Sequence, residues 1–197
     1  MNLPNKLTVL RMLLVPVFMI FIVLPGLFGF NGFLCDFLAA VFFGAAAFTD
    51  FLDGNIARKR GIVTDFGKFL DPIADKFMVF GALFALMAVE NSYFRYILLF
   101  VTTIVVLREL AVTALRLVAK GEANVVIAAS WLGKVKTASQ SVGIVLMLLE
   151  KHIFSFSDFF VEYRPISVIS CIVIVYFTLI SGIDYMKTYW KFLSKER

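Results

Sequence analysis

The sequence contains little of what metal-binding or disulfide-stabilised domains need. Its 197 residues include two cysteines and one histidine. Cys35 and Cys171 lie in separate apolar runs, where a free thiol behaves as a small hydrophobic group. They form neither a disulfide framework nor the cysteine spacing of a metal site. His152 falls among expected loop residues, and we assign it no part in chemistry. Any chemistry must therefore rest on other side chains.

Charge is scarce as well. Charged residues make up 17% of the chain, against 61% hydrophobic residues, and the mean hydropathy is +0.92. A soluble domain averages about 45–50% apolar residues, so the composition indicates an integral membrane protein. There is no internal repeat, no low-complexity stretch and no soluble basic domain. Nucleic acid is therefore not an expected partner despite the net charge of +5.

The N-terminal segment has some features of a signal peptide. Lys6 and Arg11 precede the apolar stretch Met12–Leu24. However, no convincing small-x-small cleavage site follows, and Pro25, Gly26 and Gly29 are more typical of a turn. We expect this segment to remain as a membrane-spanning helix.

The apolar runs predict six membrane-spanning helices, because each crossing needs about 20 mostly apolar residues. Turn residues or polar clusters separate the runs. The expected architecture is all-α, one transmembrane domain over residues 1–197, with helices at 7–28, 33–58, 67–89, 93–119, 131–151 and 165–190.

Basic residues are distributed unequally between the two expected faces. Only Arg95, Lys151 and Arg164, of 19 basic residues, fall on the face opposite the termini. The positive-inside rule then predicts that both termini are cytoplasmic, in the cell (inner) membrane. The basic face suits anionic lipid headgroups or phosphorylated substrates. Three aromatic residues near the C-terminus are expected to anchor the last helix at this interface: Tyr185, Tyr189 and Trp190. The acids of the opposite face are expected in loops: Glu90, Glu150, Asp158 and Glu162.

Four aspartates interrupt the second and third apolar runs. Asp50 and Asp53 are three residues apart, and Asp71 and Asp75 are four apart, so each pair shares a helix face. A short basic connection makes the two helices antiparallel neighbours, which brings both pairs close to the cytoplasmic surface. Four carboxylates in one place favour a hard divalent cation such as Mg²⁺, Ca²⁺ or Mn²⁺. A spare carboxylate could deprotonate an attacking hydroxyl.

A structural interpretation of these acids is the alternative. They could be interfacial caps paired with the basic residues around them, Arg58, Lys59, Arg60, Lys68 and Lys76. Two facing pairs with Gly54 and Gly67 beside them fit this poorly, because glycines leave room for a ligand or a close backbone. Asp65 does not share the spacing and is expected in a loop or cap.

This segment resembles the signature of the CDP-alcohol phosphotransferase family, D-x-x-D-G-x-x-A-R-x8-G-x-x-x-D-x-x-x-D. All eight fixed residues are present: Asp50, Asp53, Gly54, Ala57, Arg58, Gly67, Asp71 and Asp75. The resemblance implies a six-helix, usually homodimeric enzyme using Mg²⁺ or Mn²⁺, as one or two ions. It implies that an alcohol attacks the lipid-side phosphorus of CDP-diacylglycerol and that CMP leaves.

The resemblance also implies roles for these residues. Asp50, Asp53 and Asp71 are implied to bind metal. Asp75 is implied to be the general base, a metal ligand or both. The remaining four, Gly54, Ala57, Arg58 and Gly67, are implied to line the CDP site.

A second polar group is expected in the fourth and fifth helices. Arg108 and Glu109 lie well inside the fourth apolar run, and Glu109, Thr113 and Arg116 follow one helical stripe. Lys134, Lys136, Thr137 and Gln140 come after the next connection. An acceptor with its own phosphate would need such cations, so Arg108, Arg116, Lys134 and Lys136 are candidate phosphate ligands. Glu109 is expected to organise the arginines. The alternative is a buried Arg108–Glu109 pair with ordinary positive-inside lysines.

Flanking segments resemble the phosphatidylglycerophosphate synthase branch of the same family. They are N-L-P-N-K-L-T-V-L-R at the start, R-E-L-A-V-T-A-L-R, and G-K-V-K-T-A-S-Q. The implied acceptor is sn-glycerol 3-phosphate. Asn5, Thr8 and Arg11 become candidates for the mouth of the CDP-lipid site, although Asn5 could instead cap the first helix.

Other functions remain open at this stage. Cardiolipin synthesis, with phosphatidylglycerol as acceptor, and transfer to an inositol species would use the same chemistry. An ion-coupled transporter or channel also carries intramembrane acids, but its acids are expected near the bilayer midplane. Here the acids are expected near one surface.

Overall fold

The computed structural model describes residues 3–60, 65–90, 93–123 and 131–193. Within these ranges, only the backbone is described at 3–4, 50–60, 65–69, 117–123 and 189–193. The described chain is helical, with seven helices: α1 (Leu3–Phe28), α2 (Gly32–Arg60), α3 (Asp65–Val89), α4 (Phe94–Ala123), α5 (Trp131–Ile153), α6 (Asp158–Tyr163) and α7 (Pro165–Leu193). Six of these are long and apolar enough to cross a membrane. The predicted all-α architecture with six spans is confirmed, and the chain is a multi-pass membrane protein.

Several element boundaries differ from the prediction. α1 begins at Leu3, so Asn5 lies inside the helix and the expectation that it caps the helix is wrong. Asp65, expected in a loop or cap, is the first residue of α3. Polar residues near the starts of the first and third apolar runs suggested that these helices begin later in the sequence. A helix continues wherever its backbone hydrogen bonds are made, so its ends are its least predictable part.

α6 was not predicted. It occupies the connection that the sequence analysis left as a break, and Asp158 and Glu162 therefore lie in a helix rather than in a loop. The ring of Phe160 stacks on that of Phe154, with centroids 4.6 Å apart. Arg164 follows in the left-handed conformation, with φ of 45°, and Pro165 then begins α7.

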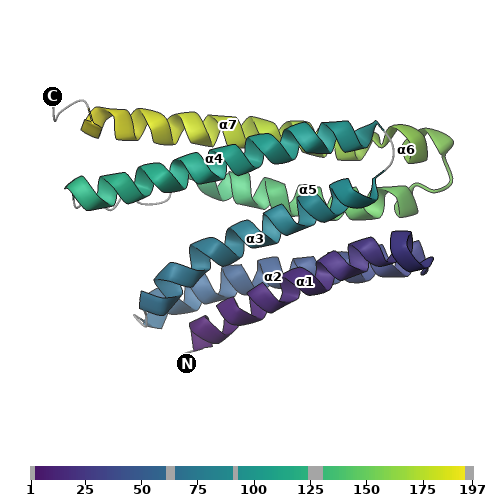
Figure 1. Ribbon diagram of the computed structural model, residues 1–197, viewed down its shortest axis with the longest axis horizontal. Helices are drawn as coiled ribbons and strands as arrows, with labels where there is room; N and C mark the ends of the chain where they lie inside the picture. Colours follow the sequence, from purple (N-terminus) through teal and green to yellow (C-terminus); the bar gives the residue numbers. More distant parts are fainter. Residues whose placement is uncertain (1–2, 61–64, 91–92, 124–130, 194–197) are drawn as a thin grey trace.

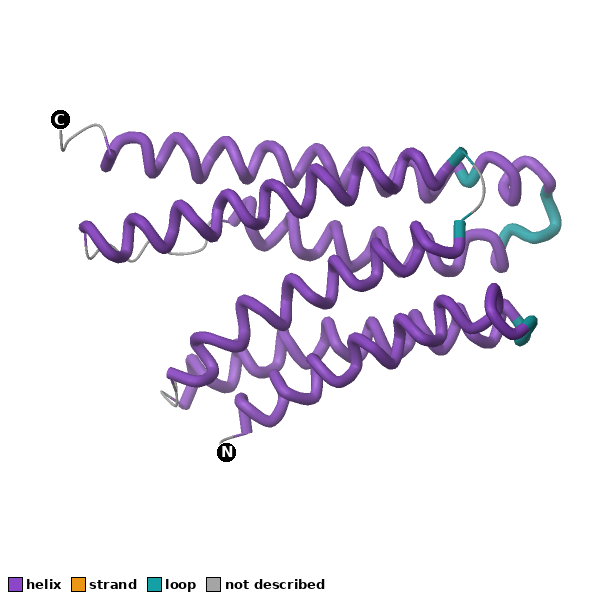
Figure 2. The backbone as a smooth tube through the Cα atoms, in the orientation of Figure 1, coloured by secondary structure: helices purple, strands orange, loops and turns teal. Residues whose placement is uncertain are grey.

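The spanning helices form two groups that lie side by side (Figures 1 and 2). α1 packs on α2 and α3, whereas α7 packs on α4 and α5. Contacts of α2 with α5 and of α3 with α4 join the groups. Both termini lie at one end of the bundle, and α6 lies at the other (Figure 1).

Aromatic and small residues pack the interior. Phe18 of α1 and Phe43 of α2 are fully buried and meet edge to face, with ring centroids 5.4 Å apart. Gly81 brings α3 against α1, since a Cβ there would lie 2.9 Å from Met19 Sδ. Small residues commonly permit such close packing between membrane helices. Large apolar side chains cover the outside, as expected for contact with lipid: Leu13, Phe100, Leu107, Val142 and Ile172 are examples.

Buried ion pairs hold together the end that carries α6. Glu150 was expected in an outer loop, but it lies in α5 and is 2% exposed. Its carboxylate accepts hydrogen bonds from the N–H groups of Ile166 and Ser167, both at 2.7 Å. It thereby satisfies backbone donors that the first turn of α7 leaves without a helical partner. Glu90 lies in the connection just after α3, as predicted, and it pairs with the buried Arg164.

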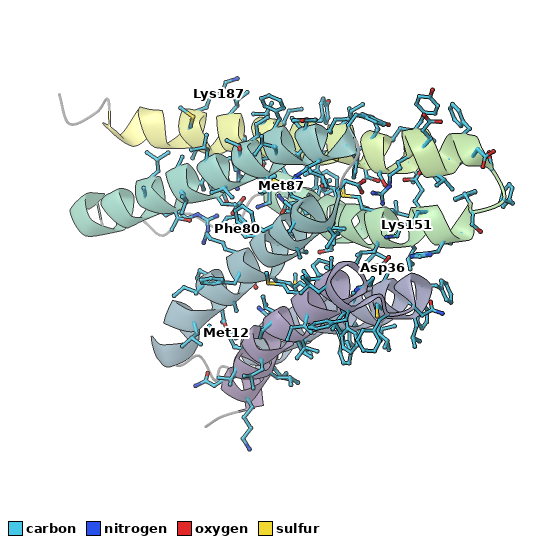
Figure 3. All side chains as sticks on the ribbon, turned by 45° about the vertical axis from the view of Figure 1, so that its right-hand side comes forward. Met12, Asp36, Phe80, Met87, Lys151 and Lys187 are labelled. Carbon is cyan, nitrogen blue, oxygen red and sulfur yellow. The ribbon has the colours of Figure 1, made fainter. Side chains whose placement is uncertain are left out.

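Asp36 forms a second ion cluster at this end. It is buried in α2, where Oδ2 lies 2.8 Å from Lys151 Nζ and 2.7 Å from His152 Nε2. Figure 3 shows Asp36 and Lys151 facing each other across α2 and α5. His152 lies in the last turn of α5, not in a loop. These contacts join the two helix groups at the end of the bundle opposite the termini. The predicted acidic pairs lie at the other end, near the termini.

Candidate active site

A cavity of about 330 Å³ opens between α3, α4, α5 and α7. α3 contributes carboxylates, whereas α4 and α5 contribute cations. The polar residues that line it are Asp71, Asp75, Lys76, Arg108, Glu109, Thr113, Arg116, Lys134, Lys136, Thr137, Gln140 and Tyr185. The cavity therefore joins two clusters that are separate in the sequence.

The acidic side of the cavity is held by the first helix. Asp71 and Asp75 are one turn apart on α3, at the start of its apolar span, which begins at Leu70. Thr8 Oγ1 donates to Asp71 Oδ1 at 2.6 Å. Arg11, fully buried, forms an ion pair with Asp75, whose side chain is 46% exposed. Asp75 thus has a defined orientation and an accessible face.

The residues of α1 explain why this arrangement forms. Asn5, Thr8 and Arg11 follow one another at intervals of three, so they lie on one face of α1. All three are buried. A buried arginine is stable only with a compensating charge, and Asp75 supplies it. The Lys76 ammonium donates to the carbonyl of Pro72 at 3.0 Å. The other basic residues of the cap interpretation, Arg58, Lys59, Arg60 and Lys68, have side chains outside the described residues.

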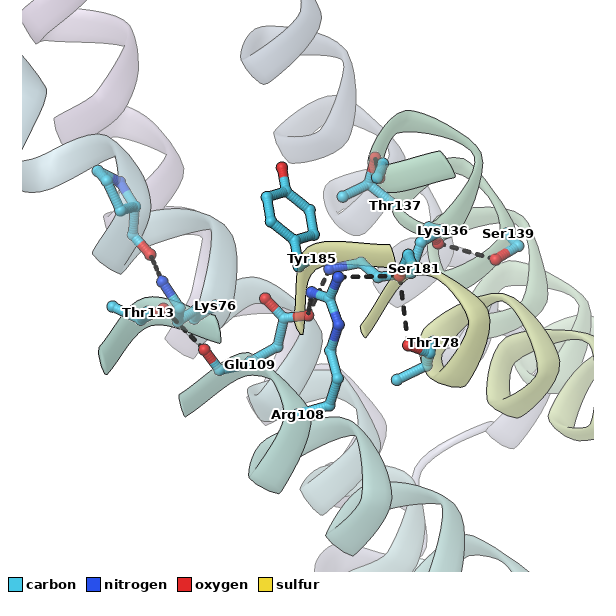
Figure 4. A network of polar contacts seen from close by, with 12 residues as sticks. Lys76, Arg108, Glu109, Thr113, Lys136, Thr137, Ser139, Thr178, Ser181 and Tyr185 are labelled. Atoms are coloured by element: carbon cyan, nitrogen blue, oxygen red, sulfur yellow. Dashed lines mark hydrogen bonds and ion pairs between the residues drawn. The ribbon is translucent and has the colours of Figure 1, made fainter. Parts of the chain in front are cut away.

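The basic side is organised by one carboxylate (Figure 4). Glu109 Oε1 accepts from Arg108 Nη1 at 2.7 Å and also from the Lys136 ammonium. Arg108 Nη2 reaches Ser181 Oγ of α7 at 2.9 Å. Glu109 thus contacts Arg108, as expected of an organiser, but its second partner is Lys136 rather than Arg116. One carboxylate fixes two cations at the cavity wall.

Tyr185 forms another part of this wall. It is 4% exposed, so the expectation that it anchors α7 in the membrane interface is wrong. Its hydroxyl accepts a hydrogen bond from Arg116. The Arg116 guanidinium carbon lies 4.7 Å from the ring centroid, and that of Arg108 lies 5.7 Å away. The Tyr185 ring therefore makes cation–π contacts with both arginines.

Most of the predicted residues come together here. The four candidate phosphate ligands, Arg108, Arg116, Lys134 and Lys136, share the cavity with Asp71 and Asp75. Asn5, Thr8 and Arg11 lie on the neighbouring face of α1. The side chains of Asp50, Asp53, Gly54, Ala57, Arg58 and Gly67 lie outside the described residues, although the backbone of α2 and α3 that carries them is helical.

The residues present have the chemistry of a divalent-metal site. Within the described side chains, no three His, Cys, Asp or Glu residues gather as metal ligands. Asp71 and Asp75 nevertheless offer hard oxygen donors from one helix face at the cavity edge, which suits Mg²⁺ or Mn²⁺. Asp50 and Asp53 would complete the ligand set.

Comparison with known proteins decides the family. The sequence model of the CDP-alcohol phosphatidyltransferase family matches residues 1–184. The chain belongs to this family. Its phosphatidyltransferase relatives include a Bacillus subtilis (strain 168) protein named CDP-diacylglycerol–glycerol-3-phosphate 3-phosphatidyltransferase, 38% identical over 98% of this chain and 97% of the relative. An Escherichia coli (strain K12) protein with the same name is 34% identical over 94% and 93%. A Mycobacterium tuberculosis (strain CDC 1551 / Oshkosh) protein, named probable phosphatidylglycerophosphate synthase, is 36% identical over 94% and 80%.

Proposed function

We propose that this CDP-alcohol phosphatidyltransferase transfers the phosphatidyl group of CDP-diacylglycerol to sn-glycerol 3-phosphate. The products are phosphatidylglycerol phosphate and CMP. One observation carries the proposal: a single cavity joins the carboxylates of Asp71 and Asp75 to a cluster of cations. The names of the relatives support the same donor and acceptor.

The charge of the cavity favours a phosphorylated acceptor. The basic side is lined by four cations and by the single carboxylate of Glu109, an excess of three positive charges: Arg108, Arg116, Lys134 and Lys136. A phosphate monoester carries nearly two negative charges at pH 7. Arginine and lysine are the usual ligands of such a group. Neutral inositol would leave these cations uncompensated, and phosphatidylglycerol brings one charge.

The acidic side would hold the metal. Asp50, Asp53, Asp71 and Asp75 would bind Mg²⁺ or Mn²⁺, as one or two ions. A bound divalent ion neutralises negative charge on the pyrophosphate of the donor. Thr8 and Arg11 fix the described carboxylates from α1. With Asn5 and the signature residues Gly54, Ala57, Arg58 and Gly67, they would form the CDP-lipid site.

The reaction then needs one base and one oriented hydroxyl. The cations of α4 and α5 hold the acceptor phosphate, which positions the terminal hydroxyl of glycerol 3-phosphate beside Asp75. Asp75 accepts the hydroxyl proton, and the oxygen forms a bond to the lipid-side phosphorus. The bond from that phosphorus to the oxygen of CMP breaks, and CMP leaves. Positioning and charge stabilisation supply most of the catalysis in such phosphoryl transfers.

The proposal includes the setting of the enzyme. We place it in the cell (inner) membrane, with the termini and the active site at the cytoplasmic face, because three of 19 basic residues fall at the other end. Membrane lipids surround it, and a homodimer is the proposed assembly. Labelling of introduced cysteines in intact cells tests the orientation, and light scattering of the purified protein tests the dimer.

The test of the activity is CMP release by the purified protein. CDP-diacylglycerol is supplied with glycerol 3-phosphate, phosphatidylglycerol or inositol in separate reactions, with Mg²⁺, Mn²⁺ or a chelator. We expect release with glycerol 3-phosphate and metal only. Release with another acceptor alone would overturn the acceptor assignment. No release with any alcohol would favour a transporter instead.

A further inference from the structure

Gln140 has an unusual environment within the cavity. It lies on α5 one turn after Lys136, so the two side chains share a helix face. Gln140 is 2% exposed and lines the cavity. Its side-chain nitrogen Nε2 has no hydrogen-bond partner among the residues that the structure describes. Buried polar groups nearly always have partners, so an unpaired amide nitrogen beside a cavity points to a ligand.

The chemistry of an amide restricts what that ligand group is. A glutamine side chain is neutral and both donates and accepts hydrogen bonds, as a hydroxyl does. Phosphate has better partners on the same wall, namely the guanidinium of Arg116 and the ammonium groups of the two lysines. The reacting hydroxyl has Asp75. The amide is therefore left for a neutral group that neither reacts nor carries charge.

Glycerol 3-phosphate has one such group. Besides the phosphate and the reacting terminal hydroxyl, it carries a hydroxyl on its central carbon. We propose that the Gln140 amide hydrogen-bonds this central hydroxyl and makes the enzyme select acceptors that carry it. The inference rests on the proposed function, since it concerns the same acceptor.

The consequence for specificity is large because the amide is buried. A site built to hydrogen-bond a substrate hydroxyl rejects an analogue that lacks it, since a buried polar group then stays unpaired. We expect the wild-type enzyme to prefer glycerol 3-phosphate over 3-hydroxypropyl phosphate, which lacks only the central hydroxyl, by roughly 10- to 100-fold in kcat/KM.

The experiment compares both acceptors in the wild type and in Gln140→Leu, which keeps the volume and removes the amide. We expect Gln140→Leu to lower kcat/KM for glycerol 3-phosphate and to leave kcat/KM for 3-hydroxypropyl phosphate unchanged. The ratio of the two kcat/KM values then falls close to one. Ser139→Ala is the matched control, because Ser139 bonds the carbonyl of Lys136 and does not line the cavity. It is expected to keep the wild-type preference.

Two results would overturn the inference. Equal use of both acceptors by the wild type would do so without any variant, even if Gln140→Leu fails to fold. An equal loss for both acceptors in Gln140→Leu would assign the residue to packing alone. Failure of the proposed function is visible separately, since the wild type would then release no CMP with glycerol 3-phosphate.

Discussion

Tyr185 offers a sharp test of the basic side of the cavity. If it is part of the acceptor site, Tyr185→Phe removes the hydroxyl that accepts from Arg116 and leaves the ring beneath the guanidinium. A hydrogen bond to a charged group contributes about 1.5–3 kcal/mol, and each 1.4 kcal/mol corresponds to tenfold in affinity. We therefore expect the KM for glycerol 3-phosphate to rise about tenfold.

Tyr185→Leu removes the ring as well. A cation over a buried aromatic face gains about 2 kcal/mol, so a further rise of roughly 30-fold is expected. The assay is CMP release with glycerol 3-phosphate varied at saturating CDP-diacylglycerol, and then the reverse. The KM for the donor is expected to stay within about twofold, because the donor is assigned to the α1–α3 side. An unchanged acceptor KM, or equal changes in both, would refute the assignment and leave Tyr185 a role in packing only.

The remaining predictions address the base, the lysines and the far end of the bundle. Asp75→Asn is expected to abolish turnover and largely spare CDP-lipid binding in a direct binding assay; equal loss of both would contradict a role limited to the base. Lys134→Ala with Lys136→Ala is expected to raise the KM for glycerol 3-phosphate more than that for the donor, and parallel changes would remove both lysines from the acceptor site. Glu150→Ala leaves the first turn of α7 without its acceptor, so a loss of about 2 kcal/mol and a Tm lower by roughly 4–8 °C are expected, with both KM values unchanged. A wild-type Tm would contradict this.

Periodicity explains what could be predicted from the sequence. Arg108, Glu109 and Arg116 are spaced so that a helix places them along one side, and Asp71 and Asp75 are one turn apart. Apolar runs fixed the six spans because the bilayer sets their length. These features depend on local geometry, and local geometry is readable from spacing.

Contacts between distant helices explain what could not be predicted. Glu150 looked like an outer loop acid because its partners, the first N–H groups of α7, are 16 and 17 residues away. The contacts of Asp36 could not be predicted either, because Lys151 and His152, which lie 2.8 Å and 2.7 Å from its Oδ2, belong to the distant helix α5. Tyr185 resembled an interfacial anchor, since aromatic residues near the end of a span are usually that. Only the packing of α7 on α4 reveals its contact with Arg116.

The cations at the cavity could be predicted as a group but not in their connections. Lys136 and Arg108 were expected to face phosphate directly. Both line the cavity, but each also contacts the same oxygen of Glu109. That arrangement depends on α4 and α5 meeting around the cavity, which spacing within a single helix does not determine.

The most direct test of the proposed function is the stoichiometry of a single turnover. Purified protein in excess over CDP-diacylglycerol is mixed with isotopically labelled glycerol 3-phosphate and Mg²⁺, and CMP and lipid products are quantified together by mass spectrometry. The account predicts one labelled phosphatidylglycerol phosphate for each CMP, and neither product when a chelator replaces the metal. Release of CMP without label in a lipid, or undiminished product with the chelator, would contradict it.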